Sequence, residues 1–327
     1  MTAGDKRGER RIIYAIVGPT ASGKTNAGFE LARRVGAEII SVDSRQVYRY
    51  LDVGTDKISA ADRRIVPHHL IDVADPDEIF SAADFLERAS NAISRISSRG
   101  RIPLLVGGTP LYYRALEGNL LSESLPKDET VRKKLELEAS AAGTSALHGR
   151  LLNVDPQSAA RIHPNDRVRL VRALELYELT GRPAPELYAE KRKMGASVEL
   201  FYFGMSMPRP LLYEKIERRV NQQFRSGYVE EVEWLLGLGY SRALPALQGF
   251  GYREIADYLD GKITFEEAIQ GDIRSTKAFS RRQDTWFKHF SPILWYDIFK
   301  CTIEKVVGDM EEVILGGNFL KRVGTNA

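Results

Sequence analysis

The chain has 327 residues, of which 43% are hydrophobic and 28% charged, and its formal net charge is only +3. This composition is typical of a globular protein, and the length is enough for two structural units. The single cysteine, Cys301, excludes an internal disulfide and a zinc site built from several cysteines. No apolar run approaches the ~18 residues that span a bilayer. We therefore expect a cytoplasmic protein with no membrane partner.

Short apolar, β-branched runs alternate with amphipathic segments in the first half of the chain. Strands separated by crossover helices predict a parallel sheet that is covered on both faces. Two later apolar runs are expected to complete the same sheet. The predicted strands are 12–17, 38–42, 69–73, 102–106, 200–205 and 292–296, and the first helices are 25–35 and 81–98.

The pattern changes near residue 121, because no strand is predicted between 121 and 195. We expect an α/β, P-loop-type core with a mostly parallel sheet flanked by helices, formed by residues 1–120 and 199–327. A small all-helical insertion domain is expected at 121–198. The remaining predicted helices are 128–142, 166–180, 208–226, 228–237, 252–259 and 264–290.

The first strand leads directly into a G-x-x-x-x-G-K-[ST] motif. Glycines let such a loop wrap around phosphate oxygens with its backbone N–H groups pointing inward. Lys24 adds a positive charge, and Thr25 offers a hydroxyl to Mg²⁺. The motif predicts a site for a diphosphate or a nucleotide, formed by Gly18, Pro19, Thr20, Ala21, Ser22, Gly23, Lys24 and Thr25.

An NTPase usually carries an aspartate at the end of a later strand, where it helps to hold the metal. Here the strand 102–106 ends in Gly107-Gly108-Thr109, and the acid that ends a nearby strand is Asp43. Ligands of α/β folds bind at this edge of the sheet. Asp43 could bind Mg²⁺, act as a base, or cap the next turn with Ser44, and the residues alone leave these roles open.

Positive charge gathers in two segments of the nearly neutral chain. Residues 161–172 carry four arginines against one aspartate, and residues 274–288 carry five basic residues against one acid. Such clusters indicate either a polyanion bound at defined places or two solvated helix faces.

Six segments occur in the order in which tRNA dimethylallyltransferases (tRNA isopentenyltransferases) carry them. The chain resembles this family over residues 12–290, in its bacterial form, since it has no C-terminal zinc finger. The ordered set is highly specific, whereas the first segment alone is shared by many P-loop proteins. The segments are GPTASGKT at 18–25, DSRQVY at 43–48, PHHLID at 67–72, VGGT at 106–109, GYREI at 251–255 and RRQDTWF at 281–287.

The resemblance implies transfer of a dimethylallyl group from dimethylallyl diphosphate to N6 of adenosine 37 in tRNA. It makes Asp43 the general base, Arg219 a contact of the diphosphate and Thr25 the residue that holds Mg²⁺ through the diphosphate. Adjacent Arg218 is expected to point elsewhere. Because the loop and Lys24 would stabilise the departing diphosphate, no Walker B acid is needed. We expect a monomer whose partners are dimethylallyl diphosphate and the anticodon stem-loop of tRNA.

The same resemblance implies contacts with tRNA, whose target base must leave the anticodon-loop stack. Asp43, Ser44, Arg45 and Gln46 would meet this base, and Thr109 would lie near it. Further contacts are implied for Arg169 and Arg172 on the anticodon stem, and for Gln248, Gly249, Phe250, Gly251, Tyr252, Arg253, Arg281, Arg282 and Gln283. Two positions depart from the family pattern: Pro110 stiffens the loop after Thr109, and Ala278 stands where a basic residue is expected.

Two other functions remain open from the residues alone. One is a P-loop kinase with ATP in the loop, and the other is an RNA-binding module whose phosphate loop is structural. His68 and His69 are interpreted as structural, because no cysteine or acid lies at ligand spacing. Tyr252, Trp286 and Phe287 could either stack on bases or be buried.

Overall fold

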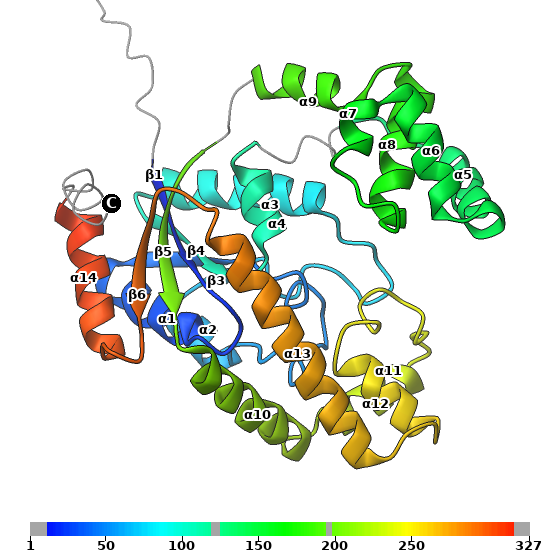
Figure 1. Cartoon of the computed structure of the whole chain (residues 1–327). Helices are drawn as coiled ribbons and strands as arrows, with labels where there is room; N and C mark the ends of the chain where they lie inside the picture. Colours follow the sequence, from blue (N-terminus) through cyan, green and yellow to red (C-terminus); the bar gives the residue numbers. More distant parts are fainter. Residues whose placement is uncertain (1–11, 119–124, 194–197, 317–327) are drawn as a thin grey trace, which may run out of the picture. The chain divides into compact units, whose positions relative to one another are not determined.

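The computed structural model describes residues 12–118, 125–193 and 198–316 (Figure 1). The chain divides into two compact units. Residues Met1–Tyr113 and Val198–Ala327 form the first, here the core unit, and Arg114–Ser197 form the second, here the helical unit. Among the described residues, no helix combines the length and apolar character needed to cross a bilayer.

The core unit is built on one six-stranded sheet in the order β3-β2-β4-β1-β5-β6, and every pairing is parallel. The α/β fold and the parallel sheet predicted from the sequence are confirmed. The carboxyl ends of the central strands therefore meet at one edge, where such folds bind ligands. The strands are β1 (Ile12–Val17), β2 (Ala37–Ser41), β3 (His68–His69), β4 (Ile102–Gly107), β5 (Glu199–Ser206) and β6 (Ile293–Asp297).

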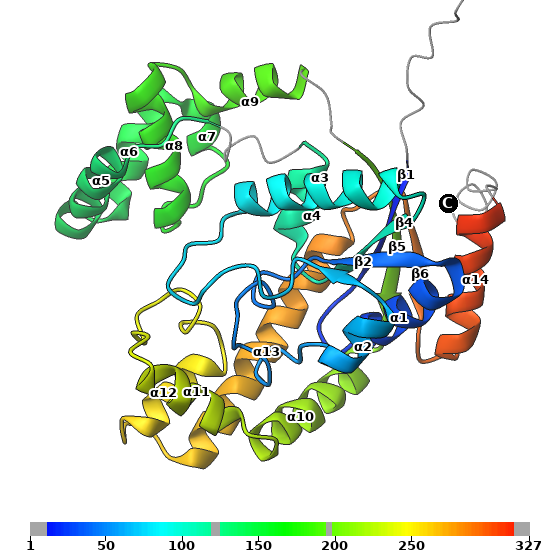
Figure 2. The same cartoon turned by 180° about the vertical axis from the view of Figure 1, so that it is seen from behind.

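Helices cover both faces of this sheet (Figures 1 and 2). Helices α1 (Lys24–Val35) and α14 (Ile303–Gly316) pack with Phe201 and Phe203 on one face. Tyr202, between them in the strand, points to the other face and contacts Tyr113 of α4 (Pro110–Leu116). Phe287, near the end of α13 (Phe265–Phe287), contacts the same tyrosine.

A second hydrophobic core lies beyond the carboxyl edge of the sheet. It joins the loop after β2 to α10 (Arg209–Arg225), α11 (Tyr228–Gly237), α12 (Tyr252–Leu259) and α13. Capping boxes at Ser81 and Thr264 fix the starts of α3 (Ala82–Ser98) and α13. As a result, segments far apart in the sequence pack around the loops that follow the central strands.

The helical unit contains no strand within its described residues, 114–118 and 125–193. Its main core combines small apolar residues with leucines at helical spacing, among them Leu135, Leu151, Leu170 and Leu174. Gly181, in a left-handed conformation, ends α8 as the sequence predicted. Its helices are α5 (Glu129–Ala142), α6 (Thr144–Val154), α7 (Pro156–Ala159), α8 (Arg167–Thr180) and α9 (Ala184–Lys193).

Three features differ from the sequence predictions. The strand predicted at 69–73 is wrong beyond His69, because Leu70 and Asp72 adopt positive φ angles of 64° and 57° that no strand allows. Helix α13 ends at Phe287 rather than at residue 290. Six helices in the described part of the chain were not predicted: α2 (Ala60–Ile65), α4, α6, α7, α9 and α14; of these, α4 begins at Pro110, a position that proline favours.

The loop after β4 depends on a close approach to β2. Gly107 lies so near Val42 that a Cβ on Gly107 would be 2.1 Å from the Val42 carbonyl oxygen. On either side, the Val42 N–H donates to Val106 O at 2.8 Å and the Thr109 N–H donates to Val42 O at 3.1 Å. Backbone thus packs directly on backbone here, without room for a side chain.

We predict that Gly107→Ala lowers the free energy of unfolding by about 2 kcal/mol or more, because the strands must separate to admit the methyl group. Gly237→Ala is the matched control, since nothing lies within 4 Å of its added Cβ and the residue is helical. The control should be neutral or raise stability by up to about 1 kcal/mol. Denaturant unfolding followed by circular dichroism measures both, and equal effects would contradict the prediction.

Candidate active site

The phosphate loop connects β1 to α1 with a backbone that two of its glycines make possible. Gly18 has φ 152°, and a Cβ there would lie 2.6 Å from Met205 O of β5. Gly23, at φ 82°, caps α1, whose first turn contains no acidic residue. The N-terminus of α1, with the positive end of its helix dipole and no acidic side chain in its first turn, therefore adjoins the loop, an arrangement that favours an anion.

Four cationic side chains surround this loop. Lys24, Lys215, Arg218 and Arg219 line a cavity of about 460 Å³, which Thr25 and the carboxylate of Asp56 also border. The expectation that Arg218 points elsewhere was wrong, because α10 presents Lys215, Arg218 and Arg219 together at three- and four-residue spacing. This excess of positive charge suits a ligand with several negative charges.

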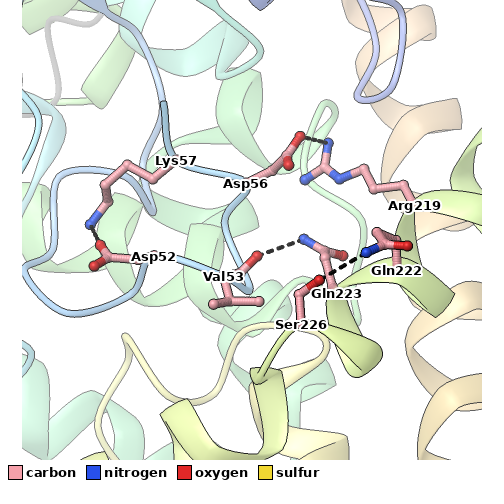
Figure 3. Close-up of a pocket in the computed structure, with 8 residues that line it drawn as sticks. All are labelled: Asp52, Val53, Asp56, Lys57, Arg219, Gln222, Gln223 and Ser226. Carbon is pink, nitrogen blue, oxygen red and sulfur yellow. Dashed lines mark hydrogen bonds and ion pairs between the residues drawn. The ribbon is translucent and has the colours of Figure 1, made fainter. Parts of the chain in front are cut away.

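Arg219 is held against the loop. Its Nη1 donates to Thr20 Oγ1 at 2.9 Å and lies 3.6 Å from Asp56 Oδ2, while its buried Nε has no hydrogen-bond partner among the described residues. Figure 3 shows the neighbouring cavity of about 360 Å³, into which Arg219 and Asp56 also project. Arg219 therefore has donor capacity for an anion in the loop.

The surroundings of Lys24 act on its pKa in opposite directions. Its Nζ donates to Pro19 O at 3.0 Å. Burial lowers the pKa of Lys24 to about 8; the nearby Asp43 opposes this shift, and Arg219 adds to it. Lys24 and Asp43 are thus close enough to interact electrostatically, and a bound anion would restore the full charge of the lysine.

Asp43, separated from the end of β2 by Val42, begins a tight turn. Its Oδ1 accepts hydrogen bonds from the N–H groups of Arg45 at 2.9 Å and Gln46 at 3.3 Å. Ser44 N–H donates to Thr109 Oγ1 at 3.0 Å, which fixes the turn to the end of β4. One oxygen therefore caps the turn, while Oδ2 accepts no hydrogen bond from the described residues and is available to a substrate proton.

The amide of Gln283 joins three parts of the site. Its Oε1 accepts from Thr20 N–H of the phosphate loop at 2.8 Å, and its Nε2 donates to Gly108 O at 2.6 Å. The side chain is buried, and a Cβ on Gly108 would lie 2.4 Å from its Nε2. Gln283, which sequence analysis predicted as a tRNA contact, is buried in this structure and positions the loop.

Arg45 also points inward. Its guanidinium lies 4.7 Å from the Phe250 ring centroid and 4.8 Å from that of Tyr252, and Nη1 donates to Phe250 O. A Cβ on Gly249 would meet this guanidinium, and one on Gly251 would meet the Tyr228 hydroxyl. The segment 248–253, which sequence analysis assigned to tRNA contacts, thus holds Arg45 and, through it, the turn that begins at Asp43.

Within the predicted tRNA-contacting segment 248–253, exposure differs between neighbours. Tyr252 is fully buried, and its hydroxyl donates to Glu231. Gln248 is exposed and donates to Arg242 O, and Arg253 is exposed beside Glu254. Gln248 and Arg253 are therefore accessible to a ligand. Tyr252 supports the segment from inside the protein.

Gln46 connects the end of β2 to the loop that carries Asp56. Its amide accepts from Ser41 Oγ and donates to Thr55 O, which holds the loop that carries Asp56. The same loop is fixed by Glu231, whose carboxylate accepts from three successive backbone N–H groups at residues 52–54. Sequence analysis missed Glu231, because nothing in its neighbourhood signals a partner some 180 positions away.

The basic clusters separate into paired and exposed arginines. In the helical unit, Arg172 bonds Glu175 and Pro126 O and its side chain is 14% exposed, whereas that of Arg169 is 64% exposed. In the core unit, Arg281 and Arg282 are both exposed. Arg169, Arg281 and Arg282 are thus accessible to solvent, whereas Arg172 stabilises its own unit.

The histidine pair has a structural role in this geometry. His69 Nε2 lies 2.7 Å from Glu38, which also pairs with Arg99. In the described part of the chain, no group of three or more His, Cys, Asp or Glu residues could hold a metal ion. Of the two neighbouring aromatics on α13, Phe287 is buried and Trp286 is 40% exposed.

Comparison with known proteins identifies the family. The family model of IPP transferases matches residues 46–290, three quarters of the chain. The chain belongs to the IPP transferase family. A relative from Moorella thermoacetica, named tRNA dimethylallyltransferase, is 46% identical over 307 residues and covers 92% of this chain and 94% of its own.

Solved structures of IPP transferases share the fold. The tRNA isopentenylpyrophosphate transferase of Bacillus halodurans is 40% identical, with a TM-score of 0.69 over 96% of this chain and 98% of its own. A eukaryotic dimethylallyltransferase acting on tRNA gives a TM-score of 0.80 over 95% of this chain and 80% of its own. At 23% identity, this second likeness concerns the fold alone.

We predict that Gln283→Glu weakens pyrophosphate binding about tenfold, because a carboxylate loses the donor to Gly108 O and adds negative charge beside the loop. Isothermal titration calorimetry measures the dissociation constant. Gln270→Glu, exposed on the same helix, is the matched control and should leave binding unchanged. Unaltered binding by the Gln283 variant would remove its positioning role.

We predict that pyrophosphate binding weakens from pH 7 to pH 9, because the lowered pKa of Lys24, about 8, leaves the empty site uncharged at Lys24 above that pH. Binding near pH 9 should then take up a proton at Lys24. Titrations in buffers of different ionisation enthalpy measure this uptake. Lys24→Arg cannot titrate in this range and supplies the baseline, so identical pH profiles for both proteins would contradict the assignment.

Proposed function

We propose that this IPP transferase moves the dimethylallyl group of dimethylallyl diphosphate onto N6 of adenosine 37 in tRNA and releases diphosphate. Its curated relatives carry the name tRNA dimethylallyltransferase and align with more than 90% of the chain. The observation that carries the mechanism is the position of Asp43: its turn is hydrogen-bonded to Thr109 after β4, and the neighbouring Gly108 is connected to the phosphate loop through Gln283. Base and leaving-group site therefore share one edge of the sheet.

In this reaction the bond between C1 of the dimethylallyl group and the diphosphate oxygen breaks, and a bond from C1 to N6 forms. Negative charge builds on the leaving diphosphate, where Lys24, Arg219 and the loop N–H groups stabilise it. Adenine N6 is a weak nucleophile, and its proton passes to Asp43 as the new bond forms. The cap on Oδ1 holds the carboxylate still and leaves Oδ2 for this proton.

Magnesium fits the same site. Thr25, the first residue after Lys24, presents an exposed hydroxyl at the cavity. Mg²⁺ is commonly held by one or two protein groups together with substrate phosphates, so the absence of a metal-binding acidic cluster among the described residues does not exclude it. Thr25 would hold the ion through the diphosphate, and the ion would neutralise part of the charge on the leaving group.

The nucleic-acid partner in this proposal is the anticodon stem-loop of tRNA. Exposed Arg169 and Arg281 supply phosphate contacts, and exposed Arg282 adds a further contact with the RNA. The target adenine must leave the loop stack to reach Asp43.

A kinase that uses ATP in the same loop is less well supported, because β4 ends in Gly107-Gly108-Thr109 rather than in a metal-binding acid.

We predict that Asp43→Asn lowers turnover about 10²–10⁴-fold, since asparagine keeps the capping oxygen but cannot accept the N6 proton. Affinity for the anticodon stem-loop should stay within about twofold of the parent protein, because the turn is retained. Mass analysis of tRNA nucleosides after incubation with dimethylallyl diphosphate and Mg²⁺ measures the product. Exposed Asp77→Asn is the control, and near-normal turnover of the Asp43 variant would sink the base assignment.

A further inference from the structure

Helix α13 presents different chemistry on its two flanks. Its buried row passes through Thr276, Ser280 and Gln283, the residue that holds the phosphate loop. At about 100° per residue, Arg281 falls on one flank, where it lines a cavity with Pro19 and Lys288. Phe279 and Arg282 fall on the other flank, so the two neighbouring arginines face different surroundings.

The flank of Phe279 is connected to the catalytic turn by stacked groups. The Arg45 N–H donates to Asp43 Oδ1, and the Arg45 guanidinium lies over the Phe250 ring. The Phe250 ring in turn lies 5.1 Å from that of Phe279, tilted by 40°.

The outer end of this row is Arg282, whose guanidinium lies 5.8 Å from the Phe279 ring centroid. Arg282 is exposed, and the rings of Phe250 and Phe279 are both partly exposed. A row of planar aromatic and guanidinium groups thus extends from Asp43, the proposed general base, to the solvent.

We propose that Phe279 and Arg282 form a stacking platform for the nucleobase adjacent to the target adenosine in the RNA strand. This inference rests on the function proposed above and adds a specificity-determining contact to it. When the target base is extruded, its neighbour loses a stacking partner and exposes a π-face. A partly exposed aromatic ring beside a guanidinium replaces that partner, and base–aromatic stacking of this kind is worth about 1–3 kcal/mol.

The position of the platform supports this role over simple packing. It shares a flank with the turn of Asp43, and Gln283, the next residue after Arg282, fixes the phosphate loop. A neighbouring nucleobase held on Phe279 would therefore have a fixed position relative to both Asp43 and the phosphate loop. Packing between α13 and the 248–253 segment would need only an apolar side chain at 279, which makes the two roles separable.

Phe279→Leu separates them, because leucine keeps apolar volume but removes the π-face. Anticodon stem-loops carrying 2-aminopurine at position 36 or 38 report stacking of either neighbour. With the parent protein, fluorescence of one of the two probes should be quenched on binding, and the variant should lose this quenching. The KM for the unmodified stem-loop should rise about fivefold or more, with kcat within about twofold.

A cycle with an abasic nucleotide at the quenched position provides the decisive comparison. Removing that base should raise the KM of the parent protein about fivefold but should have no further effect on Phe279→Leu. Phe265→Leu, an exposed phenylalanine near the other end of α13 that packs on Phe224 and Tyr258, is the matched control. It should respond to the abasic RNA as the parent does.

Two outcomes would overturn the proposal. Equal increases in KM for intact and abasic RNA would assign Phe279 to packing alone, and quenching that persists in the variant would place the neighbouring base elsewhere. Should Phe279→Leu fail to fold, Arg282→Lys repeats the cycle, since lysine keeps the charge but loses the plane. Turnover of dimethylallyl diphosphate by the parent protein tests the proposed function separately, because it does not depend on the stacking contact.

Discussion

The amide of Gln283 is the contact on which the geometry of the site depends. This side chain accepts a hydrogen bond from the Thr20 N–H and donates one to Gly108 O. It therefore joins the loop after β1, the loop after β4 and helix α13. An amide suits this position because it offers a donor and an acceptor at a fixed spacing. Glycine at 108 is required by the same contact, since any side chain would displace the amide.

Electrostatics then divides the carboxyl edge of the sheet into two regions. Around the phosphate loop, four cations face one carboxylate, Asp56. The turn after β2 contributes the carboxylate of Asp43, which favours the charged form of Lys24 while burial disfavours it. A site of this kind attracts a polyanion and holds a proton acceptor beside it, which is the requirement for diphosphate release coupled to deprotonation of an amine.

Not all residues of the family motifs face the solvent. Arg45, Tyr252 and Gln283 belong to motif segments, yet each turns its functional group into the protein. They hold neighbours such as Asp43, which is partly buried, and Gln248, which is exposed. The flank of α13 on which each arginine lies likewise distinguishes Arg282, beside Phe279, from Arg281, which lines a cavity with Pro19.

The sequence by itself determined the parallel α/β core, the phosphate loop and the aspartate at the end of β2, because these follow from local periodicity and from a contiguous motif. It also separated the helical segment 121–198 by the absence of a strand pattern. Only the tertiary structure decided that Gln283 and Glu231 support the site, that Arg218 lines the cavity, and that the chain bends at Leu70 and Asp72. Those features arise from contacts between residues far apart in the chain, or from backbone angles that packing imposes, and neither leaves a periodic trace in the sequence.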